Sequence, residues 1–167
     1  VSAITRSARG VLAVAVKDAT AGGATEAAYK SLAEVPEDKF SPENYRLLKL
    51  AFLAAPTKVW VLRVGEDAEK TYQALERLRF DWLAAPGLED ARVMSFIKTL
   101  RNGGRGVKAV VANATAPDCE GIVNLCVSGL TLEDGAMEAK DYAVRVAALL
   151  AALPLTRSAT YVNLPEV

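Results

Sequence analysis

The chain has 167 residues, of which 51% are hydrophobic and 24% are charged, as expected for one globular domain. Its 20 basic residues balance its 20 acidic residues, so it lacks the basic excess that is typical of nucleic-acid-binding proteins. It contains no histidine, which excludes Ser-His-Asp and Cys-His nucleophile pairs and histidine-ligated metals.

Cysteine content and hydropathy exclude further classes. Cys119 and Cys126 do not form a disulfide framework or a zinc site, and Cys126 lies in an apolar run that favours a buried thiol. No apolar stretch approaches the roughly 20 residues needed to cross a bilayer. The first ten residues, VSAITRSARG, lack the apolar segment of a signal peptide. Because the chain starts with valine and stops abruptly, we expect it to be a piece of a longer protein.

The first third of the chain predicts one strand and one helix. Residues 10–17 (GVLAVAVK) form a β-branched run typical of a strand, whereas the Ala- and Gly-rich stretch 18–28 is expected to be the least structured part. A helix is predicted over 41–56, with Ser41 as N-cap and a proline at each end.

The middle of the chain continues the alternation. Residues 58–64 (KVWVLRV) are apolar on both faces apart from Arg63, which indicates a covered strand. Residues 67–79 have helical periodicity, and 80–86 (FDWLAAP) form the next predicted strand.

The last part adds two helices and two strands. A helix is predicted over 88–104, ended by a left-handed cap at Asn102 and Gly103. Strands are predicted at 107–114 and 121–127, and a long helix at 138–154. This order predicts an α/β fold, with a mostly parallel sheet flanked by helices on both faces.

Three groups of residues are candidates for chemistry. Gly22 and Gly23 follow the first strand, where an α/β fold places a phosphate loop. No GxGxxG or GxxxxGK[ST] pattern is present, however, so a flexible connection is the better interpretation. The glycines of NGGRG (102–106) precede a strand and are expected to cap a helix.

A carboxylate pair is the second group. Asp118 and Glu120 follow the predicted strand 107–114, at the edge where parallel sheets place active sites. Without histidine they require a metal or each other for catalysis, so this hypothesis is a ligand-binding or metal-dependent hydrolase domain. Asp118 also suits a turn after Pro117.

The closing segment LPLTRSATYVNLPEV (153–167) is the third group. Its Thr156, Ser158 and Thr160 have no activating base, because Arg157 is effectively never deprotonated. They are interpreted as hydroxyls that bind the backbone of a turn. The residues therefore predict no catalytic, cofactor-binding or metal site.

Several stretches resemble one family. FDWLAAPG, FIKTLRNGG, VKAVVANATAPDCEGIVNLC and the final AKDYAVRVAALLAALPLTRSATYVNLPEV are similar, in this order, to the central domain of contractile-tail sheath proteins. The version they resemble belongs to tailed phages and phage-like elements of Gram-positive bacteria. The likeness is strongest over 67–167, and RGVLAVAV (9–16) and 41–64 are compatible with it.

The resemblance implies a fold and a function. The fold is the sheath α/β domain, sometimes called subtilisin-like. The function is structural and neither enzymatic nor cofactor-dependent. Copies assemble as stacked hexameric rings around a tail tube, contact a baseplate, and contract to drive the tube through the bacterial envelope. The protein would be made in the host cytoplasm and reside in the virion tail.

The resemblance also implies an organisation. Residues 1–66 form the N-terminal part of the sheath domain and 67–167 the central α/β domain. Many relatives carry a β-rich insertion where this chain has only the join 65–67, so this is either a compact version or one from which a segment has been removed. Relatives extend at both ends with arms that add strands to neighbouring subunits, which is β-augmentation. Without those arms we expect a monomer or weak oligomer.

Contacts between subunits are assigned to surface charges. The candidates are Arg101, Arg105, Lys108, Glu133 and Asp134. The alternative to the sheath hypothesis remains the metal-dependent or ligand-binding domain that uses Asp118 and Glu120.

Overall fold

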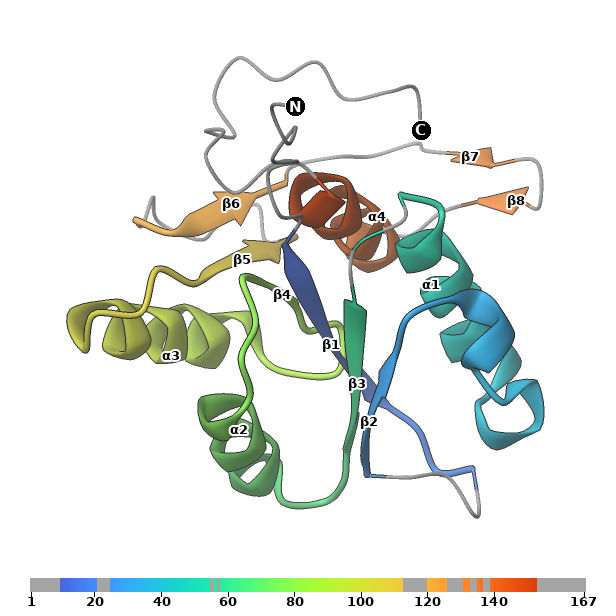
Figure 1. Cartoon of the computed structure of the whole chain (residues 1–167), viewed down its shortest axis with the longest axis horizontal. Coiled ribbons are helices and arrows are strands. Elements are labelled where there is room, and N and C mark those ends of the chain that lie inside the picture. The colour runs from blue at the N-terminus through green and yellow to red at the C-terminus, as the bar shows by residue number, and fades with distance from the viewer. Residues whose placement is uncertain are drawn as a thin grey trace, which may run out of the picture.

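The computed structural model describes residues 10–20, 25–54, 56, 58–112, 120–125, 131–132, 135–136 and 139–152. Strands and helices alternate along most of it (Figure 1). The elements are β1 (Val11–Lys17), β2 (Glu26–Tyr29), η1 (Leu32–Glu34), η2 (Glu37–Lys39), α1 (Pro42–Phe52), β3 (Lys58–Val64), α2 (Ala68–Arg77), β4 (Trp82–Ala84), α3 (Asp90–Asn102), β5 (Lys108–Val111), β6 (Ile122–Asn124), β7 (Thr131–Leu132), β8 (Gly135–Ala136) and α4 (Ala139–Ala152).

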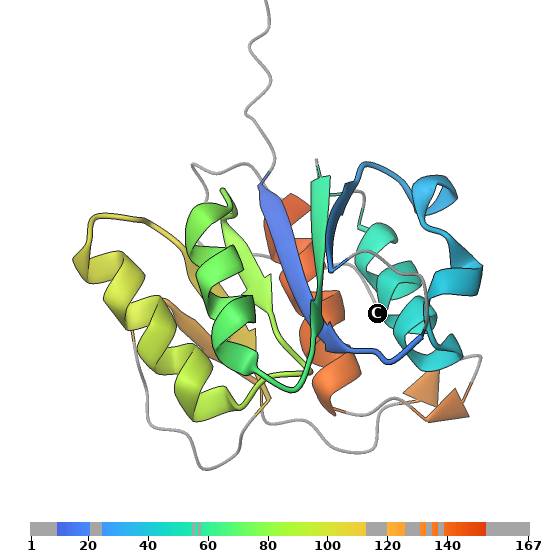
Figure 2. The ribbon, with the colours of Figure 1, turned by 90° about the horizontal axis from the view of Figure 1, so that it is seen from below.

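Six strands form one sheet in the order β2-β3-β1-β4-β5-β6. The neighbours β3-β1, β1-β4, β4-β5 and β5-β6 are parallel, and β2 is antiparallel to β3. Helices α2 and α3 cover one face and α1 and α4 the other (Figure 2). The predicted α/β fold with a mostly parallel sheet between two helical layers is confirmed.

Strand β1 lies in the middle of the sheet, paired along its whole length with β3 and over residues 12–14 with β4. Successive side chains of a strand point to opposite faces. Leu12 and Val14 therefore enter the core under α1 and α4, whereas Ala13 and Ala15 enter the core under α2 and α3. Burial on both faces explains why this strand is an uninterrupted apolar run.

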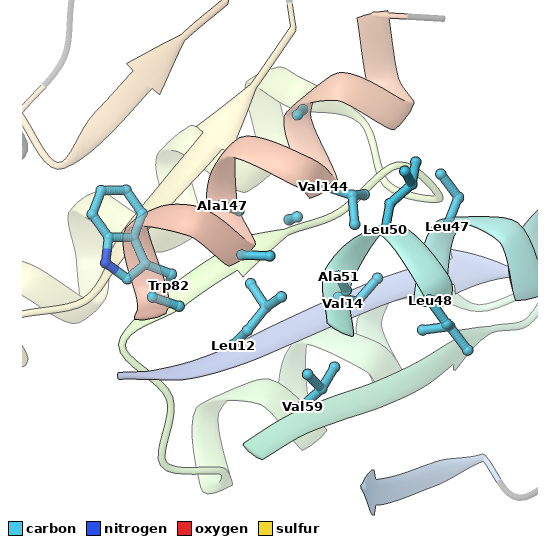
Figure 3. Packing of buried hydrophobic residues seen from close by; sticks show 14 of the residues in the cluster. Leu12, Val14, Leu47, Leu48, Leu50, Ala51, Val59, Trp82, Val144 and Ala147 are labelled. Carbon is cyan, nitrogen blue, oxygen red and sulfur yellow. The ribbon is translucent and has the colours of Figure 1, made fainter. Parts of the chain in front are cut away.

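The larger core joins the sheet to α1 and α4. Leu48 and Ala51 of α1 lie against Val14 and Val59 of the sheet, and Val144 of α4 completes the packing (Figure 3). Leu48 is fully buried, which contributes about 2 to 3 kcal/mol of transfer free energy.

Helix α1 begins as its sequence predicts. The hydroxyl of Ser41 accepts a hydrogen bond from the backbone N–H of Asn44 at 3.3 Å, and Pro42 occupies the first turn. The helix ends at Phe52, whereas it was predicted to extend to Pro56. A proline disfavours the helical conformation of the residue before it, which favours an earlier end.

The cap of α3 differs from the prediction by one or two positions. Gly103 has an ordinary φ of −79°, and the left-handed residue is Gly104, at φ 91°. The amides of Gly104 and Arg105 donate to the carbonyls of Arg101 and Leu100, so one extra residue closes the last turn before the chain reverses.

Two features of the fold were not predicted. Strand β2 begins inside the stretch 18–28 that was expected to be least structured, and β7 and β8 form a small hairpin. Three predicted strands are shorter than expected: 80–86, 107–114 and 121–127 contain β4, β5 and β6. Strands from both predicted parts, 1–66 and 67–167, lie in the same sheet, and that boundary remains a prediction.

Within the described part of the chain, no helix is long and apolar enough to cross a membrane.

Candidate functional site at the carboxyl edge of the sheet

The carboxyl edge of a parallel sheet is where α/β folds bind ligands, above all where neighbouring strands connect in opposite directions. Here that point lies between β1 and β4, because β1 connects through α1 to β3 and β3 returns through α2 to β4. The chain after β4 lies directly against the end of β1: the Gly87 amide donates to the Ala15 carbonyl at 3.0 Å. A Cβ at Gly87 would lie 2.6 Å from the backbone nitrogen of Lys17, so the contact requires glycine.

A shallow cleft of about 360 Å³ remains beside this contact. It is lined by Val16, Lys17, Asn44 and the segment 86–89. Next to it, the loop after β1 contains a fully buried carboxylate, Asp18, whose side chain has 0% exposure. We therefore take Asp18 and the groups that contact it as the candidate functional site.

Asp18 receives hydrogen bonds from three directions. One carboxylate oxygen accepts from the Thr20 amide at 2.8 Å. The other accepts from the Ser41 amide and from the Asn44 side-chain amide, both at 2.9 Å. A buried carboxylate costs stability unless its lone pairs are satisfied, and these bonds satisfy both oxygens.

Arg63 of β3 supplies the counter-charge. Its Nη1 lies 3.6 Å from Asp18 and donates to the Thr20 carbonyl at 2.9 Å, and its Nη2 donates to the Lys39 carbonyl. The guanidinium lies 4.5 Å from the centre of the Phe40 ring, and Arg63 is 8% exposed. These partners explain how an arginine can be buried in a strand that is covered on both faces.

The ionised form of Asp18 is strongly favoured. Burial by itself raises the pKa of this carboxyl, but the hydrogen bonds from Thr20, Asn44 and Ser41 outweigh that effect. The pKa of Asp18 is thus held well below its usual range. The group stays charged at every physiological pH and is a poor proton donor or acceptor.

We call Asp18, Asn44 and Arg63 the Asp18 clamp. Asn44 Nδ2 also donates to the Lys17 carbonyl at 2.7 Å, so α1 is tied to the end of β1. Arg63 ties β3 to the segments before and after β2. The charged and amide groups of the clamp are of the kind that bind ligands in other α/β proteins, but here they hold β1, α1 and β3 together. Among the described residues, no group of three Cys, Asp or Glu side chains is arranged to hold a metal ion.

Of the residues predicted from the sequence, Arg101 lies at the opposite, amino edge. Its Nη1 donates to the Val107 carbonyl at 3.1 Å and its Nη2 to the Glu120 carboxylate at 2.8 Å. Gly121, at φ 82°, allows this approach, because a Cβ there would lie 2.6 Å from Arg101 Cδ. Glu120 thus pairs with an arginine inside the chain.

Arg105 and Lys108 lie at the same edge. Arg105 donates to the carbonyls of Glu76 and Leu78 at 2.8 and 2.7 Å, where it satisfies the C-terminal end of α2. Its guanidinium lies 5.3 Å from the Phe80 ring, and Lys108 Nζ lies 5.4 Å from the Trp82 ring. The structure brings the three predicted basic residues together, and their role between subunits stays a prediction.

Other predicted residues lie outside the described part of the chain. These are Gly22, Gly23, Asp118, Cys119, Cys126, Glu133, Asp134 and the closing segment 153–167.

Sequence reasoning missed the Asp18 clamp. One signal was present, because Arg63 is the lone charge inside a strand that is otherwise apolar on both faces. A buried charge requires a partner, but nothing local identifies Asp18, which is 45 positions away.

Comparisons with known proteins point to one family. No family model matches the chain. It is 32% identical, over 183 aligned positions, to the tail sheath protein of Clostridium phage phiCD119; the match covers 99% of this chain and 49% of that protein. The predicted resemblance is confirmed.

Two solved structures share the fold. The sheath tail protein of Desulfitobacterium hafniense superposes with a TM-score of 0.71 at 14% identity, covering 87% of this chain and 59% of that one. The sheath tail protein of Listeria innocua gives a TM-score of 0.73 at 18% identity, covering 92% and 58%. The match to the phage protein, which covers 49% of that protein, shows that this chain spans about half the length of the phage relative.

Proposed function

We propose that this chain, which is related to a phage tail sheath protein over nearly its whole length, is a structural domain of a tail sheath subunit. The observation that supports this most strongly is the 32% identity across 99% of the chain. The fold, shared with solved sheath tail proteins, supports it independently of sequence. In this role the protein resides in the virion tail after synthesis in the host cytoplasm.

The finer steps of the proposal concern assembly and work. Copies form stacked hexameric rings around a tail tube, contact a baseplate, and contract to drive the tube through the bacterial envelope. The energy comes from a change in packing between subunits and not from catalysis by this domain. The commitment of the Asp18 clamp to internal hydrogen bonds is consistent with such a role.

The sheet edges suit assembly by strand addition. Among the described strands, β2 pairs with β3 and β6 pairs with β5, so each forms one edge of the sheet. An edge strand presents backbone N–H and C=O groups to a further strand. Arms in the part of the relative's length that this chain does not span are the proposed partners of these edges.

The proposed contacts between subunits also include Arg101, Arg105 and Lys108 at the amino edge, together with Glu133 and Asp134. The basic residues are half-buried, and aromatic rings lie below Arg105 and Lys108. Such amphipathic groups are suited to a contact that excludes water.

Electron microscopy tests the proposal. The complete sheath polypeptide that contains this chain is expressed with its tube protein, and we expect striated sleeves around tubes. Monodisperse particles without sleeves, under conditions in which tubes form, would contradict the proposal. Calorimetry with divalent metals tests the alternative: binding that Glu120→Gln abolishes would favour a metal site over a sheath domain.

A further inference from the structure

The neutral net charge hides an uneven distribution of charge along the molecule. Helices α2 and α3 run antiparallel to the strands, so their last turns lie beside the first residues of β3, β4 and β5. We call the basic residues there the amino-edge patch: Lys58, Arg77, Arg79, Arg105 and Lys108. Acidic neighbours at this edge are Glu76, Asp81, which accepts from the Val11 amide, and Glu120, which pairs with Arg101.

Two members of the patch have no internal partner. Arg77 and Arg79 are exposed, and they make no hydrogen bond or ion pair within the described part of the chain. Lys58 Nζ lies 4.8 Å from the centre of the Trp60 ring, which adds a half-buried cation and an aromatic surface. The patch therefore presents cations that are available to another molecule.

The carboxyl edge has the opposite character. A cleft of about 450 Å³ lies between the end of β1, the start of α2 and the start of α3. Its charged lining comprises four carboxylates, Glu66, Asp67, Glu69 and Glu89, and two cations, Lys17 and Arg92. We call it the carboxyl-edge cleft.

Two of these carboxylates are committed within the chain. Asp67 caps α2 by accepting from the Glu69 amide at 3.0 Å, and Glu69 pairs with Arg92. Glu66 and Glu89 are exposed and have no such partner among the described residues. Lys17 is also exposed, so these two carboxylates outnumber that cation and the cleft has a net negative charge.

Tyr72 adds an observation that does not depend on charge. It lines the cleft, it is only 5% exposed, and its enclosed hydroxyl has no hydrogen-bond partner in the described part of the chain. A buried hydroxyl without a hydrogen-bond partner destabilises the folded chain. Burial, reinforced by the nearby charge of Glu89, raises the pKa of Tyr72 to about 12, so the hydroxyl stays neutral. Because the hydroxyl is enclosed, an N–H group that enters the cleft reaches its oxygen only after a neighbouring side chain moves. Arg92, which is exposed and has its guanidinium 5.1 Å from the centre of the Tyr72 ring, is the neighbour that would turn away.

We propose that the carboxyl-edge cleft receives a basic side chain from the amino-edge patch of a second copy of this chain. Glu66 and Glu89 would neutralise the entering ammonium or guanidinium group, and the Tyr72 oxygen would accept one of its hydrogen bonds. The contact joins two different surfaces of identical molecules, so copies pack head to tail. A head-to-tail contact continues into rings or helices, whereas a self-complementary contact closes at a dimer.

Charge complementarity identifies the second copy as the occupant. The cleft has two unpaired acids, Glu66 and Glu89, beside Lys17, an exposed cation. The patch has two unpaired bases, Arg77 and Arg79, beside the exposed Glu76, so the two edges of the same sheet carry opposite net charge. The inference rests on the proposed sheath function, because a sheath requires many copies to repeat one contact.

A charge-swap experiment tests this pairing in the complete sheath polypeptide. One variant carries Glu66→Lys and Glu89→Lys, and the other carries Arg77→Glu and Arg79→Glu. All four residues are exposed, and circular dichroism checks that both variants fold. Each variant alone places like charges at every head-to-tail contact, so we expect its sleeve yield to fall more than tenfold. A one-to-one mixture restores opposite charges at every contact, and sleeves should return.

The outcomes separate the two proposals. A parent polypeptide that forms no sleeves would overturn the sheath function and the contact that rests on it. A parent that forms sleeves, together with variants that assemble equally well alone, would overturn the contact and leave the sheath function standing. Failure of the mixture to restore sleeves would also overturn the proposed contact, and would favour a different occupant of the cleft.

Tyr72→Phe tests the hydroxyl. It removes a group that has no partner in the free chain, so the Tm should not fall, whereas the association constant between copies at low salt should fall about tenfold. Sedimentation equilibrium measures that constant, and Tyr45→Phe on the opposite face is the matched control. An association constant unchanged by Tyr72→Phe would refute the role of the hydroxyl.

Discussion

Replacing Asp18 by asparagine should destabilise the chain more than its small change in shape suggests. In the native chain both carboxylate oxygens act as acceptors, one for the Thr20 amide and the other for the Ser41 and Asn44 amides. An asparagine has one oxygen and one NH2 group. Whichever way it is turned, its NH2 group faces a donor, and Arg63 loses its counter-charge.

The magnitude follows from the bonds lost. Hydrogen bonds to a charged group contribute about 1.5 to 3 kcal/mol each, and removing one partner of a buried ion pair costs about 3 to 5 kcal/mol. These values describe overlapping effects, so we expect a loss of about 3 to 5 kcal/mol from a total of about 5 to 15 kcal/mol. For a chain of this size that corresponds to a fall in Tm of roughly 10 °C.

Urea unfolding followed by circular dichroism measures this loss. The control is Asp38→Asn, the same substitution at a side chain that is 75% exposed and paired with Lys39, where the change should stay within about 1 kcal/mol. If Asp18→Asn unfolds within about 1 kcal/mol of the parent, the Asp18 clamp does not hold the edge of the sheet, and the reasoning is wrong.

Three further predictions concern stability. First, folding lowers the pKa of Asp18, so in acid the unfolded chain binds a proton that the folded chain does not. The stabilisation from Asp18 is complete above about pH 5 and is lost as the pH falls below about 4. The difference in free energy of unfolding between the parent and Asp18→Asn should therefore shrink in acid, and a difference that stays constant with pH would contradict this. Second, Gly87→Ala should lower the free energy of unfolding in urea by about 2 to 3 kcal/mol, because the added Cβ meets the backbone of β1. The control, Gly65→Ala, has open space around it and should be nearly neutral. Equal losses for the two variants would refute the close contact at Gly87. Third, Leu48→Ala should lower the free energy of unfolding by about 2 to 5 kcal/mol, because Leu48 is fully buried. Leu53→Ala, at a side chain that is 66% exposed, should change it by less than about 0.5 kcal/mol. Similar losses for the two variants would show that α1 does not pack as described.

The sequence predicted those parts of the fold that depend on local patterns. The apolar runs of β1 and β3 and the Ser41 cap of α1 are signals that need no knowledge of distant residues. Strand β2 could not be found in this way. Of its four residues, EAAY, only Tyr29 favours a strand, and they form one because they pair with residues of β3 that lie 30 to 36 positions later.

The candidate site was less predictable for the same reason. Asp18 stands at the start of an Ala- and Gly-rich stretch, and its Asn44 and Arg63 partners come from a helix and a strand further along. The sequence around Gly87 does not show why glycine is needed there, because the requirement comes from the close approach of the β1 backbone. Such contacts depend on tertiary structure, which a single sequence does not display.

The carboxyl edge of the sheet explains how one fold can serve structural and ligand-binding roles. In a ligand-binding α/β domain, the loops after the strands leave a crevice and direct backbone amides and side chains into it. Here the Gly87 contact narrows that crevice, and the Asp18 clamp turns the loop after β1 toward α1 and β3. Both devices make the end of the sheet rigid. A subunit that transmits force, as proposed, benefits from such rigidity, because work done at its contacts is not lost in deforming its interior. We therefore expect a change of state to move this domain as one body and to alter the contacts around it.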